Sequence, residues 1–241
     1  MPQSKLRVEI VDATENAVSI IYAACRQCYS EKFAGDIFME GSHDPKKESV
    51  FVRKVVSSGH ESPLEHAKFT FAIEGVSRAL THQLVRHRMA SYSQQSQRYV
   101  KAKDFDYIMP PSIERNKTAK EEFQKIMSVI QDSYDKLLDL MAVDNLSGEL
   151  ANQDARFILP QAAETKIVVT MNCRELLHFF KHRCCRRAQW EIRQLAERML
   201  ELCKEKLPAV FSNAGAKCES IKYCPEGEKF SCGRYPAYAQ K

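Results

Sequence analysis

No stretch of this 241-residue sequence approaches the roughly 20 uninterrupted apolar residues that a membrane-spanning helix needs. The first residues, Met1-Pro2-Gln3-Ser4-Lys5, also lack the apolar run of a signal peptide. These two absences argue against a membrane protein and against an exported one. We therefore expect a soluble, globular protein of the cytoplasm that has no membrane partner.

Internal repeats, low-complexity segments and any clear interdomain linker are also missing. Apolar residues make up 44% of the chain, which is enough to bury a core in one domain of this length. We expect a single domain over residues 1–241. Periodicity is lost after Pro208, so about residues 208–241 should form a cysteine-bearing tail.

A disulfide framework is not expected, although the chain has nine cysteines. They are spread over a long chain without an export signal, so most should be reduced thiols. Cys25 and Cys28 lie three residues apart on the buried face of an expected helix, which favours core packing over a zinc half-site. Cys218, Cys224 and Cys232 could ligate zinc or pair oxidatively, but their spacing matches no standard zinc finger. We expect loose tail thiols and no metal site.

Acidic residues are absent between Gly75 and Lys103, where six Arg or Lys side chains occur. A second acid-free patch, Lys181–Arg187, is also strongly basic. The net charge of +5 alone is too small to indicate a polyanionic partner. A single run of charge is usually a solvated face, but two such clusters in one chain favour an anionic ligand, with phosphate the first candidate.

Strand-like and helical periodicities follow one another along the chain. Alternating apolar residues predict strands at 6–10, 69–73 and 166–171. Apolar residues at helical spacing predict helices from about residue 15, over 48–58, 76–87 and 117–141, shortly before Leu159-Pro160, and over 188–207. Ser62-Pro63-Leu64-Glu65 has the cap, proline and acid of a helix start, or at least of one turn. Asn172 is placed to cap the helix that carries Arg174, His178 and Arg183.

The segment from Gln83 to Tyr99 is the most distinctive one. Its Arg86-His87-Arg88 triplet should end a helix, and three successive cationic or potentially cationic side chains cannot share one helical face. They must point in different directions, as if clamping more than one group. A polar loop of serines and glutamines follows and supplies neutral donors and acceptors, and Arg98 can hold a phosphate through two hydrogen bonds. This chemistry suits a nucleotide.

The Arg86-His87-Arg88 triplet, followed after seven residues by Ser96, resembles the signature of the flavin-dependent thymidylate synthases. Upstream, Gly59–His66 resembles the flavin-side segment of that family. Further blocks match in order and spacing: Ala155-Arg156 with Leu159-Pro160, Asn172-Cys173-Arg174, Arg183, and Ala188–Ile192. A match in several ordered blocks over roughly residues 6–207 is far more specific than any single motif.

This resemblance implies an α/β (α+β) fold with a mixed sheet and several long helices, distinct from that of classical thymidylate synthase. It implies a transferase, a methyltransferase whose single catalytic domain converts dUMP to dTMP by reductive methylation. Methylenetetrahydrofolate would donate the carbon, NADPH would be the reductant and FAD would carry the hydride. The enzyme would be a homotetramer with active sites between its subunits.

The resemblance also implies the binding residues. Contacts to the flavin would fall on His60, Ser62, Arg86, His87, Arg88, Gln94, Asn172, Arg174 and His178. The substrate dUMP would be held by Gln83, Arg86, Gln94, Gln95, Ser96, Gln97, Arg98, Arg156 and Arg183. Arg98 is the natural partner for the phosphate. His60 would lie near the flavin ring, on the route used by NADPH and folate.

Arg183 is the residue that we expect to activate the substrate. A guanidinium in the plane of the uracil can bond its carbonyl and stabilise negative charge at N3, which polarises the ring. Ser96 is a tempting nucleophile, but a serine needs a base beside it, and flavin chemistry requires no enzyme adduct. We therefore expect Ser96 to hold the substrate. None of the nine cysteines lies in a segment that matches the nucleophile of classical thymidylate synthase.

Two positions depart from the family pattern. Some members have an acid where this chain has Gln94, so hydrogen bonding is kept but charge is lost. Some have an asparagine where this chain has His178, which could contact the cofactor or be a satisfied histidine on an otherwise apolar helix face.

Two other classes of protein remain alternatives. The acid-free basic stretch, with Tyr92 and Tyr99 as stacking platforms, could bind nucleic acid weakly and with strong salt dependence. The cysteines could form a structural zinc site, whose removal by a chelator would unfold the protein. The ordered blocks favour the enzyme over both, with no nucleic-acid partner.

Overall fold

The computed structural model of the chain describes residues 4–41 and 44–238. Its strands are β1 (Arg7–Ala13), β2 (Lys68–Ser77), β3 (Ala90–Gln94) and β4 (Glu164–Asn172). Its α-helices are α1 (Ala17–Gln27), α2 (Ala34–Glu40), α3 (Pro45–Ser57), α4 (Arg78–Leu84), α5 (Pro111–Glu114), α6 (Lys117–Val143), α7 (Gly148–Ala155), α8 (Cys173–Arg183), α9 (Trp190–Lys206), α10 (Pro208–Phe211) and α11 (Lys217–Ile221). Its 3-10 helices are η1 (Ser62–His66), η2 (Arg156–Ile158) and η3 (Glu228–Phe230).

The four strands form one sheet in the order β1-β2-β4-β3. Thr70 on β2 is hydrogen-bonded to Thr170 on β4, and the backbone N–H of Gly75 donates to the carboxylate of Glu164. Numbers rise along β2 while they fall along β4, so these strands are antiparallel. The α/β (α+β) class is confirmed, but the sheet is antiparallel where a mixed sheet was expected.

Internal contacts divide the described residues into two compact units. The first contains residues 4–7, 73–86 and 92–168, and the second contains residues 8–41, 44–72, 87–91 and 169–238. The chain passes between the two units repeatedly, so neither is a continuous piece of sequence. The expectation of a single catalytic domain stays a prediction.

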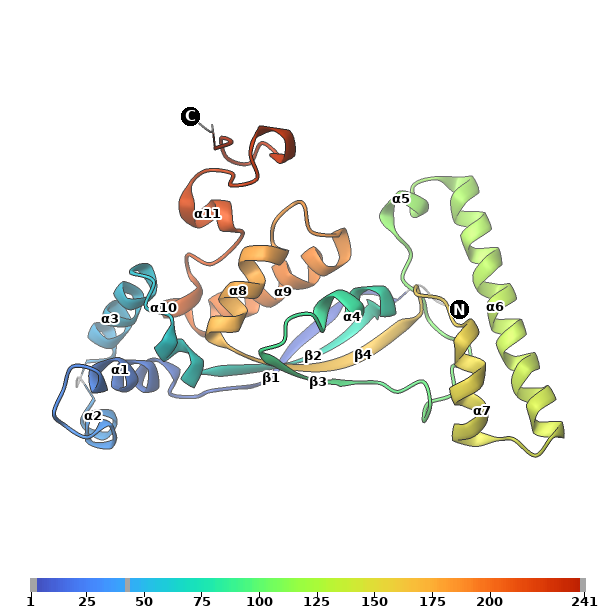
Figure 1. The fold of residues 1–241 in the computed structure, drawn as a ribbon, viewed down its shortest axis with the longest axis horizontal. Coiled ribbons are helices and arrows are strands. Elements are labelled where there is room, and N and C mark those ends of the chain that lie inside the picture. The colour runs from blue at the N-terminus through green and yellow to red at the C-terminus, as the bar shows by residue number, and fades with distance from the viewer. Residues whose placement is uncertain (1–3, 42–43, 239–241) are drawn as a thin grey trace. The chain divides into compact units, whose positions relative to one another are not determined.

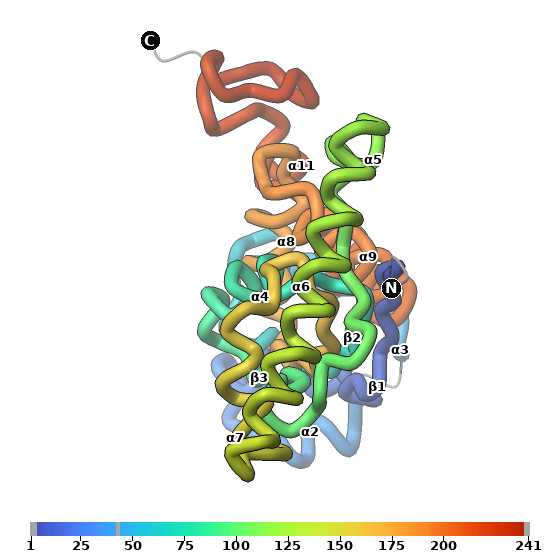
Figure 2. Tube along the Cα trace, turned by 90° about the vertical axis from the view of Figure 1, so that its right-hand side faces the viewer, coloured from blue at the N-terminus to red at the C-terminus, as the bar shows by residue number. Residues whose placement is uncertain are grey.

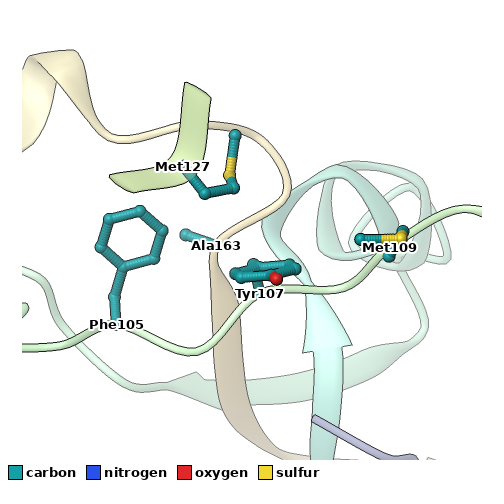
Figure 3. Close-up of a cluster of buried hydrophobic side chains, with 5 residues drawn as sticks. All are labelled: Phe105, Tyr107, Met109, Met127 and Ala163. Carbon is teal, nitrogen blue, oxygen red and sulfur yellow. The ribbon is translucent and has the colours of Figure 1, made fainter. Parts of the chain in front are cut away.

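In the first unit, α6 and α7 lie side by side (Figures 1 and 2). The buried face of α6 contributes to an apolar cluster (Figure 3) made of Phe105, Tyr107, Met109, Met127 and Ala163. On the same helix, the buried Gln131 accepts a hydrogen bond from the backbone of Phe105 at 2.9 Å and donates to the backbone of Ala102 at 3.1 Å. Because buried backbone groups need partners, Gln131 fixes the course of the chain just after Arg98.

In the second unit, α8 packs on α9 and on η1, and α10 packs on α3 and α9. Figure 1 shows α8 lying beside α9. Phe179 and Phe180 on α8 are fully buried, and the ring of Phe211 on α10 lies edge-on to Phe180 at 6.0 Å. This core holds α8, the helix on which three of the expected site residues lie.

Most of the expected elements are present, with two differences near the site. The helix start or single turn predicted at Ser62 is confirmed as a 3-10 turn. The helix before the Arg-His-Arg triplet ends at Leu84, so the triplet follows the helix instead of ending it. Part of the expected polar loop is strand β3, because its backbone pairs at the edge of the sheet. Asn172 caps α8 as expected, accepting from the N–H of Glu175 at 2.8 Å.

The cysteines depart from their expected places in two ways. Cys25 is buried on α1, but Cys28 lies beyond the end of that helix and is exposed, so the two do not share the buried face. The tail is folded and not loose: it forms α11 and η3 and buries Cys218 and Cys224. All nine cysteines are free thiols.

Within the described residues, no helix is both long and apolar enough to cross a membrane.

Candidate active site

The three side chains of the Arg-His-Arg triplet differ in exposure. His87 is 7% exposed, whereas Arg86 and Arg88 are exposed to solvent. In the described part of the chain, neither arginine has a carboxylate within ion-pair distance. The two guanidiniums can therefore offer their donors to an anionic ligand, while the imidazole is committed to the protein interior.

The His87 side chain lies between a carboxylate and a guanidinium of the second unit. Its Nδ1 is 3.1 Å from the Oε1 of Glu175, and its Nε2 is 3.0 Å from the Nε of Arg183. The ring of Phe179 meets the imidazole edge-on at 4.9 Å and covers it. Because the arginine Nε can only donate, Nε2 of His87 must be the acceptor, and Nδ1 must carry the proton that is donated to Glu175.

The electrostatics of this cluster favour the neutral imidazole. Burial, and to a smaller extent the nearby Arg183, His178 and His182, together lower the pKa of His87 to about 4. Burial also raises the pKa of Glu175 and lowers the pKa of Arg183. A guanidinium stays charged at neutral pH even when its pKa is lowered. Arg183 is therefore a cation whose hydrogen-bond partner is a neutral ring.

The flavin-side segment and the start of α8 come together in the second unit. Arg174 on α8 forms an ion pair with Glu65 on η1, and Lys181 forms one with Glu61 at 2.8 Å. Ser62 is exposed at the start of η1, the turn that packs on α8. His60 is exposed just before this turn.

His178 does not belong to the core. It is exposed on α8, with its ring 4.3 Å from that of His182 and 5.9 Å from that of His87. The reading of His178 as a satisfied core histidine is therefore wrong. The helix turns it to the same side as the buried imidazole of His87, which leaves it accessible to a ligand.

Gln94 on β3 is held by the first unit. Its amide nitrogen donates to the hydroxyls of Thr81 and Thr165, both at 3.2 Å, and both threonines are buried. The amide oxygen is then turned to act as an acceptor for another group. The next residue, Gln95, pairs through its backbone with Lys166 and with the guanidinium of Arg78.

Ser96 and Arg98 are linked to one another and to α7. The Ser96 hydroxyl accepts from the backbone N–H of Arg98 at 3.1 Å, and the side chain of Asn152 donates to the backbone carbonyl of Arg98. The Arg98 guanidinium forms an ion pair with Glu149, and its buried Nε has no partner within the described residues. An unsatisfied buried donor is costly, which makes this guanidinium a candidate for binding an acceptor group of a ligand.

Arg156 lies on η2, near Arg78. The proximity of Arg156 lowers the pKa of Arg78, after a larger lowering by burial. Two neighbouring guanidiniums in one unit are expected where an anion is bound. Gln83 on α4 and Gln97 beyond β3 are partly exposed, so both can contact a ligand.

One group in the described part of the chain has the donors of a metal site. Donor atoms of His87, Glu175 and His178 lie within 4.8 Å of one another. Both ring nitrogens of His87 already have partners, and one of these is a cation. A divalent ion would add positive charge beside Arg183, so the arrangement suits hydrogen bonding better than metal binding.

A cavity of about 830 Å³ in the second unit borders the Lys181–Glu61 ion pair, because both residues line it. It is lined by α3, α8, α10 and the tail, with Lys181, Lys204 and Arg234 among its side chains. None of the residues that the sequence predicts for the site lines it.

Known proteins identify the family. The family model described as thymidylate synthase complementing protein matches residues 9–209. The flavin-dependent thymidylate synthase of Nitratidesulfovibrio vulgaris is 56% identical over 239 residues, which cover 98% of each chain. This chain belongs to the flavin-dependent thymidylate synthase family. The expectation that it is an enzyme of this family is confirmed.

Other members of the family are similar over nearly the whole length. The flavin-dependent thymidylate synthase of Clostridium tetani is 45% identical and covers 95% of this chain, with 94% of its own length aligned. That of Pyrococcus abyssi is 41% identical, with 92% and 91% covered. Among solved structures, the UMP/dUMP methylase PolB from Streptomyces cacaoi, bound with 5-Br dUMP, matches with a TM-score of 0.73. It shares 22% identity and covers 87% of this chain and 94% of its own, which supports the fold.

The family implies a flavin, and the donors in the structure fit one. Arg86 and Arg88 are exposed cations that lack carboxylate partners in the described residues. The exposed His178 and the start of α8 behind Asn172 add neutral donors and acceptors. A dinucleotide needs cations for its pyrophosphate and neutral groups for its rings, and both kinds are present.

Several residues of the site were missed by the sequence. Glu175, Glu149 and Asn152 each contact an expected site residue but follow no motif. Glu175 is separated from His87 by 88 positions, so only the fold could reveal the pair. The one available signal was its place three residues after the helix cap, a position where carboxylates are common.

Proposed function

We propose that this protein methylates dUMP to dTMP, with methylenetetrahydrofolate as carbon donor, NADPH as reductant and FAD as cofactor. The family and the relatives' names support thymidylate synthesis with a flavin. A methyltransferase of this kind would act in the cytoplasm. The observation that carries the proposal is the positive charge of Arg183, held by a neutral imidazole and available to a ligand.

Arg183 would activate the pyrimidine. Its Nε is engaged by His87, so the remaining donors of the guanidinium point to a ligand. In-plane hydrogen bonds from these donors to a uracil carbonyl and N3 would stabilise the negative charge that grows on the ring. Because no carboxylate in the described residues neutralises Arg183, its charge acts undiminished on the substrate.

The flavin, when bound, supplies the redox chemistry that lets a one-carbon unit become a methyl group. The chain would hold FAD through Ser62, Arg86, Arg88, Gln94, Asn172, Arg174 and His178, whereas the buried ring of His87, expected among these contacts, would act only through Arg183. The exposed arginines would bind the pyrophosphate, and His60 would line the approach of NADPH and folate. Arg174 would be positioned for this contact by its ion pair with Glu65.

The substrate would be held by Gln83, Gln95, Gln97 and Arg156 together with the Gln94–Arg98 segment. The buried Nε of Arg98, which lacks a partner in the described residues, supports a role in binding the phosphate of dUMP. Ser96 would be a holder and not a nucleophile. Its hydroxyl accepts from a backbone N–H, and no histidine or carboxylate of the described residues is hydrogen-bonded to it as a base.

Absorbance spectroscopy of the purified protein, with and without dUMP, tests the proposal most directly. We expect a yellow protein whose flavin bands shift when dUMP is added and which forms dTMP when folate and NADPH are supplied. A colourless protein that binds long polyanions in a salt-dependent way would instead indicate a nucleic-acid-binding protein.

The variant Arg183→Ala tests the role of the guanidinium. We expect normal folding and flavin content with dTMP formation reduced at least about 100-fold, the cost of losing one preorganised charge donor. Arg198→Ala is a matched control, since Arg198 lies on α9 in an exposed ion pair with Glu201. Near-normal turnover of Arg183→Ala would remove Arg183 from the mechanism.

A further inference from the structure

A carboxylate, an imidazole and a guanidinium form a continuous chain in the second unit. The Oε1 of Glu175 lies 3.1 Å from Nδ1 of His87, and Nε2 of the same ring lies 3.0 Å from Nε of Arg183. The side chains of Glu175 and His87 are only 11% and 7% exposed. The buried ring of His87 thus links Glu175 to Arg183 through two hydrogen bonds, although His87 lies far from both residues in the sequence.

We propose that Glu175 is a positioning residue that sets the tautomer of His87 and through it the orientation of Arg183. This inference rests on the proposed role of Arg183 in binding the uracil ring. Glu175 touches neither substrate nor cofactor in this proposal. It acts only by deciding which nitrogen of His87 carries the proton.

The chemistry of the imidazole explains why a carboxylate is needed. A neutral histidine has one N–H and one bare nitrogen, and the hydrogen bond at one side fixes the role of the other. Glu175 accepts the proton at Nδ1, which leaves Nε2 as an acceptor for the Nε–H of Arg183. If the proton moved to Nε2, two donors would face each other and Arg183 would turn away.

The indirect link also preserves the charge of Arg183. A carboxylate bonded directly to the guanidinium would neutralise it and compete with the substrate. Here a neutral ring separates Glu175 from Arg183, so the guanidinium is oriented without an ion pair. Metal sites use the same arrangement, in which a carboxylate orients a histidine that in turn holds the functional centre.

The position of Glu175 is fixed independently of His87. Its backbone N–H is capped by the side chain of Asn172 at 2.8 Å, at the first turn of α8, and Arg183 ends the same helix. The ring of Phe179, one helical turn after Glu175, packs edge-on against His87. One helix therefore presents the carboxylate, the packing ring and the guanidinium around the imidazole.

Two substitutions of Glu175 test whether its role needs a hydrogen-bond acceptor or a negative charge. Glu175→Met removes the acceptor but keeps the length of the side chain, whereas Glu175→Gln keeps an oxygen that can accept from Nδ1. We expect Glu175→Met to lower kcat for dTMP formation by about 10- to 100-fold, with a smaller change in KM, as is usual when an orienting partner is lost. Glu175→Gln should recover most of this loss.

Glu48→Met is the matched control. Glu48 is also a carboxylate of the second unit, 5% exposed and hydrogen-bonded to Ser19, but it lies outside the chain of contacts. Its replacement should lower the melting temperature without the loss of kcat. A Glu175→Met protein that only melts earlier, like this control, would overturn the positioning role.

A double-mutant cycle on dUMP affinity tests the route through Arg183. If Glu175 acts through Arg183, then Glu175→Met weakens dUMP binding in the parent enzyme but not in the Arg183→Ala background. Equal effects in both backgrounds would overturn the proposal. Crystal structures give a readout that does not depend on activity: the contact between Arg183 and His87 should persist in Glu175→Gln and be lost in Glu175→Met.

These results separate the two proposals. If the parent enzyme forms no dTMP, the proposed function fails, while the crystal structures still decide the role of Glu175. If the parent is active and Arg183→Ala is inactive, but Glu175→Met turns over normally, then the proposed function stands and the positioning role fails.

Discussion

Arg98 has a protein partner where the substrate phosphate is expected. Its guanidinium forms an ion pair with Glu149, and both side chains are about two-fifths exposed, at 43% and 40%. An exposed ion pair is weak and exchanges readily. A phosphate of dUMP would therefore compete with Glu149 for Arg98 and could also accept from the unsatisfied Nε.

We predict that Glu149→Gln binds dUMP up to about 5-fold more tightly, because removing one exposed competing charge is worth up to about 1 kcal/mol. Titration of dUMP against the flavin spectrum measures this. Deoxyuridine, which lacks the phosphate, should bind equally tightly to the parent and to Glu149→Gln. The control Glu121→Gln, on the exposed face of α6, should leave the affinity for dUMP unchanged. Weaker dUMP binding by Glu149→Gln would show that Glu149 prepares Arg98 for the phosphate instead of competing with it.

His87 makes the stability of the fold depend on pH. Its pKa is lowered to about 4 by burial and then by Arg183, His178 and His182, whereas in the unfolded chain it titrates near 6.5. The unfolded state therefore binds a proton first as the pH falls. Stability should be lost between about pH 6.5 and pH 4, by on the order of 3 kcal/mol for this group.

Melting temperatures of the parent and of His87→Gln, at one protein concentration, test this prediction. The glutamine can accept from Arg183 but does not titrate, so its melting temperature should fall less between pH 6.5 and 4.5. Glu175, whose pKa is raised by burial, contributes in the opposite direction and is present in both proteins. An equal fall in melting temperature for the parent and for His87→Gln over this pH range would contradict a buried neutral His87.

At the scale of secondary structure, long helices with a regular apolar pattern could be predicted from the sequence, but the strand at the edge of the sheet could not. The helix expected over 117–141 is α6, Lys117–Val143, because its apolar stripe repeats over many turns. Strand β3 was expected as a loop, because Ala90–Gln94 is polar and its pairing with β4 depends on a neighbour 71 or more residues away. The residues of this segment alone therefore could not predict that it pairs with β4.

The tail shows the same limit. No periodicity predicts structure beyond Pro208, yet α11 and η3 form there. Contacts with the segment after α8 account for this: Arg187 forms an ion pair with Glu226, and its guanidinium lies 4.5 Å from the ring of Phe230. These partners lie about 40 positions apart, so the tail is ordered by tertiary contacts and not by its own pattern.

The candidate site was predictable in its residue types more than in its connections. The ordered blocks located Arg86, His87, Arg174 and Arg183, and the structure shows His87 bonded to Arg183. The blocks could not show that a carboxylate orients the pair, because Glu175 sits in no motif. They also placed Gln94 among the ligands without indicating that two buried threonines hold its amide.

At the scale of the whole molecule, exposed apolar side chains suggest where a second subunit would bind. Within the described residues, the outward face of α6 carries Ile126, Val129, Leu140 and Val143, which are between 44% and 79% exposed. Positions 126 and 140, and likewise 129 and 143, lie 14 residues apart, so they recur on nearly the same side of the helix. This apolar stripe, which Ser133 and Lys136 interrupt on the same side of the helix, is a candidate subunit contact.

We predict that the protein is a homotetramer with active sites between subunits, as its resemblance to the family implies. Light scattering coupled to size exclusion should give a mass of about 110 kDa, four times the 27.6 kDa of the chain. Charging the stripe, with Val129→Glu and Val143→Glu together, should lower this mass, because buried charges without partners are costly at an interface. Ser128→Glu, at an exposed position of α6 that points away from these four side chains, should leave the mass unchanged. If the parent protein has the mass of one chain and still forms dTMP at full rate, the sites do not lie between subunits.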